Sequence, residues 1–388
     1  MEIDQFKQLR EELHRYPELS GNESETSKRL RKFFHKIPSA TLHTDIGGYG
    51  FIADFRFPQA GPTLLFRADI DAVAVQETLP LPYCSCHAGV SHKCGHDGHA
   101  AILAAFADLL HRSPFSQGRI LLLFQPAEET GQGAREVLDH PFFKENTIDA
   151  AFALHNLPGF PRSAVVCRAG SFTCSVISCT IQIQGKTAHA AEPEKAIAPT
   201  NVLLNIWQTA DSWNHNVLTS SDYFRTTLVE LHIGEKAFGV AAGSGYIRLT
   251  FRAATEANLQ QHVRRLEQIT QELIQPIPGL TYTIEWVEAF AANENNPGAV
   301  EIIRQAARKH HFTYLETDHP FAWGEDFGLF TQHFPGAMFG LGAGTAMAAL
   351  HTPGYDFPDE VIESGAQMFY EIAHQILCGG MSIQHFVL

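Results

Sequence analysis

The sequence predicts an α/β fold with a parallel-rich sheet, interrupted by a smaller inserted domain of ferredoxin-like α+β type. Short, continuous apolar runs alternate with helical segments in the first half of the chain, at Thr63–Arg67, Ile120–Phe124 and Ala150–Leu154. Such runs are typical of inner parallel strands that are buried on both faces. From about residue 172 the pattern changes, because apolar and polar residues alternate through Val176–Gln184. That alternation indicates a strand with one solvated face.

The larger domain is predicted from two separate stretches, residues 1–171 and 289–388. Helices are expected near 3–16, 22–36 and Gly98–His111, and a further strand at Phe51–Phe57. After the insertion, a helix is expected at Pro297–His310, a buried strand at Ala337–Leu341 and a closing helix at Asp359–Leu377. Strands that alternate with helices favour a parallel sheet covered by helices.

The inserted domain is predicted to span residues 172–288. After Val176–Gln184 come a helix near 197–211, strands near 225–233 and 245–253, a helix near 256–275 and a strand near 281–288. The resulting order βαββαβ is that of a ferredoxin-like unit. Three domains in series are the alternative, but that arrangement leaves the last hundred residues with a poor core.

Bulk composition excludes several classes of protein. The 388 residues are 45% hydrophobic and carry a formal net charge of −14. This charge argues against binding to nucleic acid or to anionic membranes. The charged amphipathic start, Met1–Lys7, does not resemble a signal peptide. Seven cysteines form no disulfide-framework spacing, so we expect a protein of the reducing cytoplasm.

Acidic and imidazole side chains follow the predicted strands of the sheet. Glu128 and Glu129 come directly after Ile120–Phe124, and His155 follows Ala150–Leu154. The carboxyl ends of parallel strands meet at one edge of a sheet, which is where ligands bind in open α/β folds. Adjacent carboxylates point in different directions, so one can hold a metal while the other handles a proton. An isolated Glu-Glu pair would more often be a solvated turn.

Further metal-ligand types share this predicted edge. Asp69 and Asp71 follow Thr63–Arg67, Cys94 and His96 precede the helix Gly98–His111, and His351 lies beyond Ala337–Leu341. Thiolate, imidazole and carboxylate groups together suit divalent Zn, Mn, Co or Ni. The alternative is a structural zinc knot that uses Cys84 and Cys86, but such a knot leaves the glutamate pair unexplained.

The chain resembles a known family through seven motifs that occur in order. It is similar to the amidohydrolases of peptidase family M-twenty, subfamily D, relatives of aminoacylase, hippurate hydrolase and the plant indole-acetyl-amino-acid hydrolases. The resemblance covers nearly the whole chain. The motifs are Leu13–Glu23, Phe66–Ala72, Cys94–His99, Phe124–Glu129, Gly185–Ala191, Glu325–Phe327 and Leu350–Pro353.

The resemblance implies a role for each matching residue. Two metal ions are implied, with Cys94 as a bridging thiolate and with His96, Glu129, His155 and His351 as the other ligands. Glu128 is implied as the general base, and Asp71 as a carboxylate that orients a ligand. His189 matches a histidine that reaches the active site of the partner subunit in this family, so a homodimer formed through the inserted domain is also implied.

The predicted substrate-binding end departs from the family pattern. The family commonly carries Asn-Val-Ile-Pro there, but this chain has Gly239 in place of the asparagine. Arg252 still matches an arginine that binds the substrate carboxylate, although it could also be an ordinary outward strand residue. The implied metal chemistry is therefore intact, whereas substrate recognition is altered.

These observations predict a metal-dependent amidohydrolase that cleaves an N-acyl amino acid or a related small amide. Two alternatives remain open. The first is a dipeptidase or carboxypeptidase with the same metal core, and the second is a non-catalytic binding protein on the same fold. The presence of Glu128 counts against the second, because a binding protein has no need for a base.

Overall fold

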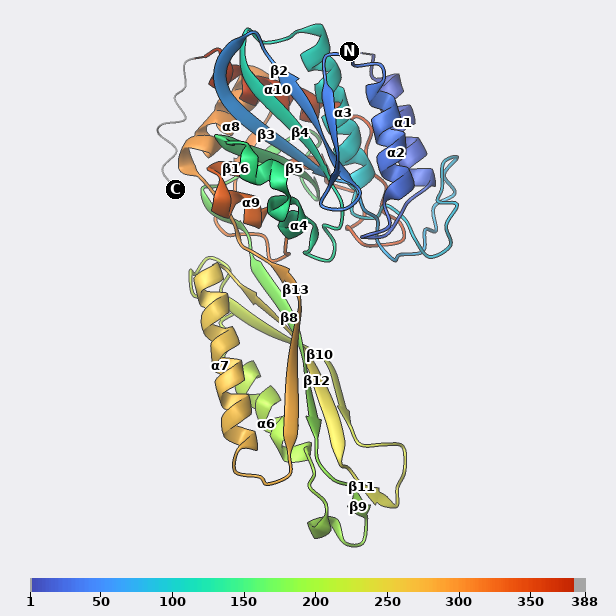
Figure 1. Ribbon diagram of the computed structural model, residues 1–388, viewed down its shortest axis with the longest axis vertical. Coiled ribbons are helices and arrows are strands. Elements are labelled where there is room, and N and C mark those ends of the chain that lie inside the picture. Colours follow the sequence, from blue (N-terminus) through green and yellow to red (C-terminus); the bar gives the residue numbers. More distant parts are fainter. Residues whose placement is uncertain (1, 380–388) are drawn as a thin grey trace. The chain divides into compact units, whose positions relative to one another are not determined.

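A computed structural model describes residues 2–379, and its contacts divide the chain into two compact units (Figure 1). Unit 1 comprises residues 2–172, 293–318 and 326–379, and unit 2 comprises residues 173–292 and 319–325. Residues 289–292 and the segment 319–325 were expected in the larger domain but belong to unit 2, where β13 (Thr281–Phe290) extends past the expected boundary. For 319–325 the reason is local pairing, because the Cys174 amide donates to the Phe321 carbonyl at 2.9 Å and Arg252 Nη1 donates to the Ala322 carbonyl at 2.9 Å.

Unit 1 is built on an eight-stranded sheet with the order β1-β2-β4-β3-β5-β16-β6-β15. Its inner pairs β4–β3, β3–β5 and β5–β16 are parallel, whereas β1–β2, β2–β4 and β16–β6 are antiparallel. The strands are β1 (Thr41–Ile46), β2 (Gly50–Arg56), β3 (Gln59–Asp69), β4 (Gln117–Gln125), β5 (Ala150–Pro158), β6 (Val165–Cys167), β15 (Tyr314–Glu316) and β16 (Gly336–Gly344).

The inner strands are the apolar runs that the sequence marks. Every residue from Ile120 to Gln125 is buried, as is every residue from Ala150 to Leu157. Successive side chains of a strand point to opposite faces, so both faces of the sheet are covered. The helices of this unit are α1 (Asp4–Arg15), α2 (Ser24–Phe34), α3 (His96–Arg112), α4 (Gly133–Asp139), α5 (Pro141–Glu145), α8 (Pro297–Lys309), α9 (Gly328–His333) and α10 (Val361–Leu377).

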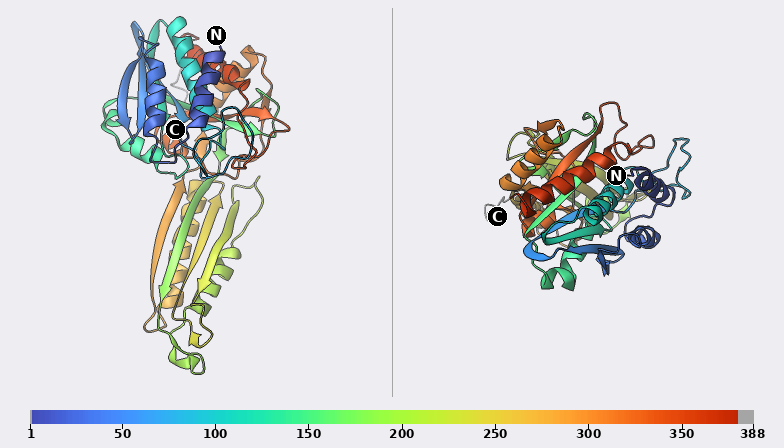
Figure 2. Two further views of the ribbon diagram at one scale, coloured as in Figure 1. Left: turned by 90° about the vertical axis from the view of Figure 1, so that its right-hand side faces the viewer. Right: turned by 90° about the horizontal axis from the view of Figure 1, so that it is seen from above.

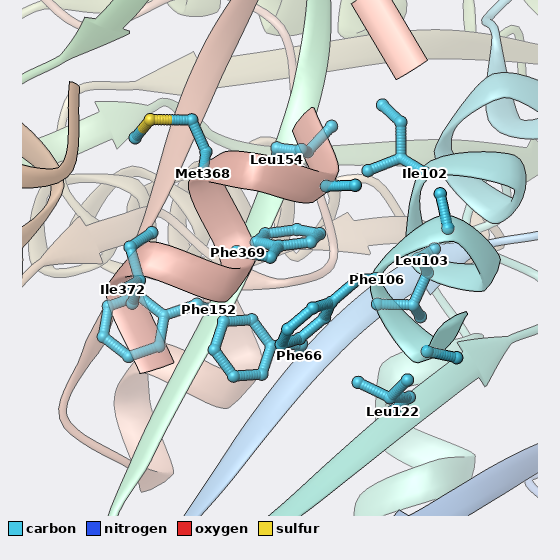
Figure 3. Close-up of a cluster of buried hydrophobic side chains, with 14 of the residues drawn as sticks. Phe66, Ile102, Leu103, Phe106, Leu122, Phe152, Leu154, Met368, Phe369 and Ile372 are labelled. Atoms are coloured by element: carbon cyan, nitrogen blue, oxygen red, sulfur yellow. The ribbon is translucent and has the colours of Figure 1, made fainter. Parts of the chain in front are cut away.

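Helices α3 and α10 pack side by side against the sheet, as the view from above shows (Figure 2). Between them and the sheet lies a cluster of aromatic rings centred on Phe66 (Figure 3). The Phe66 ring centroid is 4.9 Å from Phe106, 5.6 Å from Phe152 and 5.1 Å from Phe369. Truncating such a buried ring to alanine costs about 3–5 kcal/mol. This cluster fixes α3, whose first turn carries part of the site described below.

Unit 2 has the order βαββαβ, with strands β8 (Ser175–Gln184), β10 (Phe224–Ile233), β12 (Ser244–Ala253) and β13 (Thr281–Phe290). They form an antiparallel sheet with the order β10-β12-β8-β13, which is the ferredoxin-like arrangement. Helices α6 (Thr200–Asp211) and α7 (Glu256–Ile274) pack together on one face of it (Figure 1). The alternating strand β8 buries Ile181 and Ile183 under these helices and exposes Gln182 and Gln184.

The remaining short elements complete the chain. They are β7 (Gly170–Thr173), β9 (Ala188–His189), β11 (Val240–Ala241), β14 (Asn293–Asn295) and the 3₁₀ turn Pro193–Lys195. No helix among residues 2–379 has the length and apolar composition needed to cross a membrane. All seven cysteines are free thiols.

Candidate active site

Residues from four strands and one helix of unit 1 meet at the carboxyl edge of the sheet. Possible metal ligands gather there in overlapping groups of three, and the ligand atoms of each group lie within 4.8 Å of one another. The parallel strands β3, β4, β5 and β16 all end at this edge, and α3 begins there. One expectation needs correction, since His155 lies within β5 instead of after it. The strand continues because Gly340 of β16 still pairs with His155. These groups include Cys94–His96–His155, Cys94–Glu129–His351, His96–Glu128–Glu129 and Asp69–His96–His99.

Cys94 and His96 are placed by a glycine turn at the start of α3. Gly95 is the residue before the helix and has φ of 96°, a left-handed conformation that glycine adopts without a steric penalty. Its carbonyl accepts from the Gly98 amide at 2.9 Å and from the His99 amide at 3.1 Å, which starts the helix. Both Cys94 and His96 are buried on either side of this turn.

The two buried histidines present the same ring nitrogen to the cluster. His96 Nδ1 is 3.1 Å from both the carbonyl and a carboxylate oxygen of Asp71, and His155 Nδ1 is 2.8 Å from the Asn156 carbonyl. A carbonyl can only accept, so each Nδ1 donates a hydrogen, and in the neutral ring that binds a metal Nε2 holds the lone pair. Without a metal, burial lowers the pKa of His96, but the carboxylates of Asp69, Asp71 and Glu129 outweigh it and raise the pKa to about 10. A hydrogen bond at the far nitrogen is how proteins orient a metal-binding imidazole. His155 Nε2 is 3.5 Å from Cys94 Sγ.

The glutamate pair lies on a strained turn after β4. Ala127 has φ of 54°, which is uncommon for a residue with a side chain. Its amide donates to Glu23 Oε1 at 2.8 Å, and its carbonyl accepts from the Gly133 amide at 3.0 Å. The turn aims Glu128 and Glu129 toward His96, whose Nε2 is 3.9 Å from Glu128 Oε2 and 3.7 Å from Glu129 Oε1.

Asp71 ties three parts of the site together. Its Oδ1 faces His96 Nδ1 at 3.1 Å, and its Oδ2 accepts from the Glu129 amide at 3.0 Å and from Ser20 Oγ at 2.7 Å. Burial raises the pKa of this carboxyl, but the hydrogen bond and charge of His96 outweigh it and hold the pKa below the ordinary value. Asp71 is therefore an ionised buried acceptor that orients both His96 and the Glu129 backbone.

His351 approaches the cluster from the loop after β16. Its backbone has φ of 59°, and its amide donates to the Lys93 carbonyl at 2.7 Å, which connects this loop to the Cys94 turn. The ring Nε2 is 3.3 Å from Glu129 Oε1, and half of the side chain is exposed. His351 is thus the solvent-facing member of the cluster.

The electrostatics of the cluster suit a cation. Burial, and then the nearby Glu129 and Glu128 carboxylates, raise the pKa of the Cys94 thiol well above its ordinary value. A divalent cation inverts this effect, because a coordinating thiol loses its proton. His96 Nε2 and Glu129 Oε1 are both buried and make no hydrogen bond within the described residues. Buried polar atoms are nearly always paired, so these two atoms fit a site for a metal ion.

The alternative zinc knot has no support in the described residues. Cys84 and Cys86 are exposed thiols, and no group of three possible ligands among residues 2–379 includes either of them. Their loop is held instead by backbone contacts, such as the Cys86 amide donating to the Arg15 carbonyl at 2.8 Å.

The predicted substrate-binding residues belong to unit 2. His189 lies in β9 and pairs with Val240 of β11, and the Ala190 amide donates to the Gly239 carbonyl at 3.0 Å. His189 is exposed, and its Nδ1 accepts from the Ala191 amide at 3.1 Å, so Nε2 carries the hydrogen of the neutral ring. The structure therefore brings His189 and Gly239, fifty positions apart, into one ribbon. Arg252 lies in β12.

Several residues around the cluster were not predicted as part of the site. Glu23 holds Ala127, His99 Nδ1 lies 2.7 Å from Asp69 Oδ1, and Asn156 Nδ2 donates to the Cys94 carbonyl at 2.7 Å. Arg67 is fully buried and donates to Asp326 at 2.7 Å. Glu23 and His99 lie within the motifs Leu13–Glu23 and Cys94–His99, so their polar side chains in these motifs were a signal that the sequence offered. Asn156 lies outside the motifs and offered no such signal.

Comparison with known proteins gives consistent relatives. A model of the peptidase family M20/M25/M40 matches residues 65–375. The N-acetyl-L-cysteine deacetylase of Bacillus subtilis is 32% identical over 379 residues, which cover 95% of this chain and 87% of the relative. The N-acetyldiaminopimelate deacetylase of Bacillus velezensis is 29% identical and is aligned over 90% of this chain and 93% of its own.

A solved structure shows the same fold. The YXEP protein of Bacillus subtilis, a dinuclear metal binding peptidase, superposes with a TM-score of 0.80 at 25% identity over 97% of this chain and 98% of its own. Fold, side-chain cluster and relatives together define a metal-dependent hydrolase of amide bonds. The chain belongs to peptidase family M20/M25/M40, as its match over residues 65–375 shows.

Proposed function

We propose that the chain hydrolyses the amide bond of an N-acyl amino acid, using two divalent cations bound at the edge of the sheet in unit 1. The observation that carries this proposal is the convergence of the Cys94 thiol, the rings of His96 and His155 and the carboxylates of Glu128 and Glu129 at one place. Two atoms there, His96 Nε2 and Glu129 Oε1, are buried and make no hydrogen bond within residues 2–379. The proposed ligands are Cys94, His96, Glu129, His155 and His351.

The ligand groups would hold two ions, and Cys94 is common to two of these groups. One group of three possible ligands joins Cys94 to His96 and His155, and a second joins Cys94 to Glu129 and His351. Thiolate and imidazole ligands suit Zn, Co and Ni, while the carboxylate also suits Mn. Two bound divalent ions would activate a water and polarise the amide carbonyl.

Glu128 is the proposed general base. It is buried beside the ligand groups, and its Oε1 accepts a hydrogen bond from the Asp326 amide at 3.4 Å. That contact orients the carboxylate while Oε2 faces His96. Glu128 takes the proton from the attacking water and then passes it to the nitrogen of the leaving amine. Asp71 contributes by keeping the hydrogen of His96 on Nδ1, as described above.

His189 and Arg252 are the proposed substrate-binding residues of unit 2. The neutral ring of His189 carries its hydrogen on Nε2, so it can donate to the oxyanion that develops on the amide oxygen. Arg252 uses Nη1 for the Ala322 carbonyl and keeps other N–H donors for the substrate carboxylate. The named activities of the relatives favour a short acyl group such as acetyl.

We further propose a homodimer in the cytoplasm. The edge strands of the unit 2 sheet are β10 and β13, and both expose apolar side chains, with Val229 61%, Val287 42% and Tyr282 36% exposed. Unpaired edges with apolar residues are able to pair with a second copy across a two-fold axis.

Turnover of a substrate panel tests the proposed function. Purified protein is stripped with a chelator, reloaded separately with Zn, Mn, Co or Ni, and supplied with N-acetyl and N-benzoyl amino acids and with dipeptides. We expect metal-dependent release of the free amino acid from the N-acyl substrates. Faster cleavage of dipeptides would favour the peptidase alternative, and binding without turnover of any substrate would favour a binding protein.

A further inference from the structure

Resting on the metal site proposed above, we propose that Asn156 and Tyr355 are positioning residues that hold the Cys94 turn in place for metal binding. Neither side chain belongs to the proposed ligand set. Both are fully buried, with 0% exposure, directly behind the turn that carries Cys94. Their hydrogen bonds set where the thiol stands relative to His155.

Asn156 uses both ends of its side-chain amide. Its Nδ2 donates to the Cys94 carbonyl at 2.7 Å and lies 3.0 Å from His99 Nε2. Its Oδ1 accepts the hydrogen bond of the Tyr355 hydroxyl. The oxygen and one hydrogen of the amide therefore each have a buried partner of their own. The second hydrogen shares the lone pair of His99 Nε2 with the backbone N–H of Asn156, and buried hydrogen bonds of this kind keep the side chain in one orientation.

The Tyr355 hydroxyl determines which way the Asn156 amide faces. A carbonyl can only accept, so the Cys94 carbonyl requires the NH₂ group of the amide and would be repelled by its oxygen. The hydroxyl of Tyr355 donates to Oδ1 and thereby keeps the NH₂ group toward Cys94. Without that hydroxyl, Oδ1 is a buried acceptor with no donor from Tyr355, which is a costly arrangement.

Gly95 shows how closely the turn fits against this pair. A side-chain carbon placed on Gly95 would come within 2.5 Å of Asn156 Nδ2 and 3.1 Å of the Tyr355 hydroxyl. The turn therefore rests on these two groups at contact distance. A second connection comes from Lys93, whose Nζ donates to the Tyr355 carbonyl at 2.7 Å. Lys93 and Cys94, the two residues before Gly95, are thus hydrogen-bonded to Tyr355 and Asn156 respectively.

The network also reaches the strand that carries His155. The Asn156 amide nitrogen donates to His99 Nε2 at 3.0 Å, and His99 Nδ1 is 2.7 Å from Asp69 Oδ1. Because Asn156 directly follows His155, it links the backbone of one proposed ligand to the carbonyl of another. The Cys94 Sγ to His155 Nε2 distance of 3.5 Å depends on this link.

The test is cobalt binding by the Tyr355→Phe and Asn156→Asp variants of the full chain. Tyr355→Phe removes one hydroxyl, and Asn156→Asp places an oxygen where Cys94 requires a donor. Tyr370→Phe is the matched control, because it removes a hydroxyl that donates to the Ser113 carbonyl at 3.1 Å outside this network. Protein stripped of metal is titrated with Co²⁺, and both the thiolate-to-cobalt absorption band and the affinity against a competing chelator are recorded.

We expect both variants to bind Co²⁺ about 10–100-fold more weakly, as removal of outer partners of metal ligands usually does. Their thiolate-to-cobalt band should also weaken or shift, while Tyr370→Phe matches the wild type. Folded variants with the wild-type affinity and band would overturn the positioning role. A wild-type protein that binds Co²⁺ without any thiolate band would instead overturn the proposed ligand set, so the two failures are distinguishable.

Discussion

At Gly239 the chain departs from the family pattern, which commonly has an asparagine there. The surroundings of Gly239 have room for a side chain. A carbon added there meets no atom within 4 Å, and the backbone does not have the left-handed φ that would strain another residue. The Gly239 carbonyl accepts from the Ala190 amide at 3.0 Å, so an asparagine at this position would add an amide group to the same ribbon that carries His189, the proposed oxyanion donor.

Gly239→Asn should therefore lower KM for N-acetyl amino acids without changing kcat. A hydrogen bond to a charged substrate is worth roughly 1.5–3 kcal/mol, which is about one to two decades in affinity. The wild type should accordingly show a high KM and intact chemistry. Ala237→Asn on the same exposed loop is the control. A wild-type KM well below millimolar would mean that another contact binds these substrates.

His14 is a buried, charged side chain that contacts Asp97, the residue after His96. Its Nδ1 is 2.8 Å from Asp97 and its Nε2 is 3.0 Å from Glu77, so both ring nitrogens face carboxylates. Burial lowers the pKa of His14, but these hydrogen bonds outweigh it and raise the pKa to about 9 from 6.5. Arg10 and Asp356 complete its charged surroundings.

His14→Gln should change how stability depends on pH. A histidine with a raised pKa in the folded state stabilises fully below pH 6.5 and loses that contribution as pH rises through 9. At 1.36 kcal/mol per pKa unit, the contribution is about 3 kcal/mol at most. Urea unfolding at pH 6 and 9.5, with chelator present, measures it. A gap between wild type and variant that is equal at both pH values would contradict the pKa, and exposed His333→Gln is the control.

At the scale of elements, the start of α2 supports the turn that carries Glu128 and Glu129. Glu23 precedes α2, and its Oε1 accepts from the Gly21 amide at 2.9 Å and from the Ala127 amide at 2.8 Å. Ala127 stays in its left-handed conformation only while such contacts hold it. The helix start is therefore connected to the proposed base through one hydrogen bond.

Glu23→Leu should lower kcat at least tenfold while KM changes little. The Ala127 backbone would relax and move the Glu128 carboxylate, whereas substrate contacts in unit 2 stay as they are. Glu23→Gln keeps an acceptor oxygen and should retain most of the activity. Glu25→Leu, on the exposed side of the same helix, is the matched control. Steady-state kinetics at saturating metal measure kcat and KM for each variant. A fully active Glu23→Leu variant would show that the Ala127 turn keeps its conformation without the hydrogen bond to Glu23.

Local patterns predicted the elements better than their pairing. The runs Ile120–Phe124 and Ala150–Leu154 are buried inner strands, because continuous apolar sequence is needed where both faces of a sheet are covered. Strand β1 and the short helix α9 were not predicted, since β1 is largely solvated and α9 is only 6 residues long. The antiparallel pairing of β2 with β4 was not predicted either, because it depends on contacts between residues far apart in the sequence.

The same distinction holds for the site. Residues that end strands, such as Glu128 and Glu129, could be predicted because topology brings strand ends together. Glu23 contacts a residue 104 positions away and Tyr355 contacts one 199 positions away, so no local pattern reports them. Such contacts depend on how the packed core places α2 and the loop before α10.

At the scale of the whole molecule, the exposed edges of unit 2 predict a dimer. Static light scattering at micromolar concentration should give twice the chain mass of 42.9 kDa. Val229→Lys places a charge on edge strand β10, and Val287→Lys places one on edge strand β13. The variant with the charge on the strand that forms the interface should be monomeric. Val217→Lys, which is exposed outside the sheet, is the control. A strict monomer with full activity would refute both the dimer and a role for His189 across it.

The central claim is that one carboxylate of the glutamate pair transfers protons while the other binds metal. Glu128→Gln tests it most directly, with metal content and N-acetyl amino acid turnover measured on the same preparation. The account predicts two metal ions per chain, as in the wild type, and a loss of about 10²–10⁴-fold in kcat, the usual contribution of general acid–base catalysis. A variant that keeps its metal and remains within tenfold of wild-type activity would contradict Glu128 as the base.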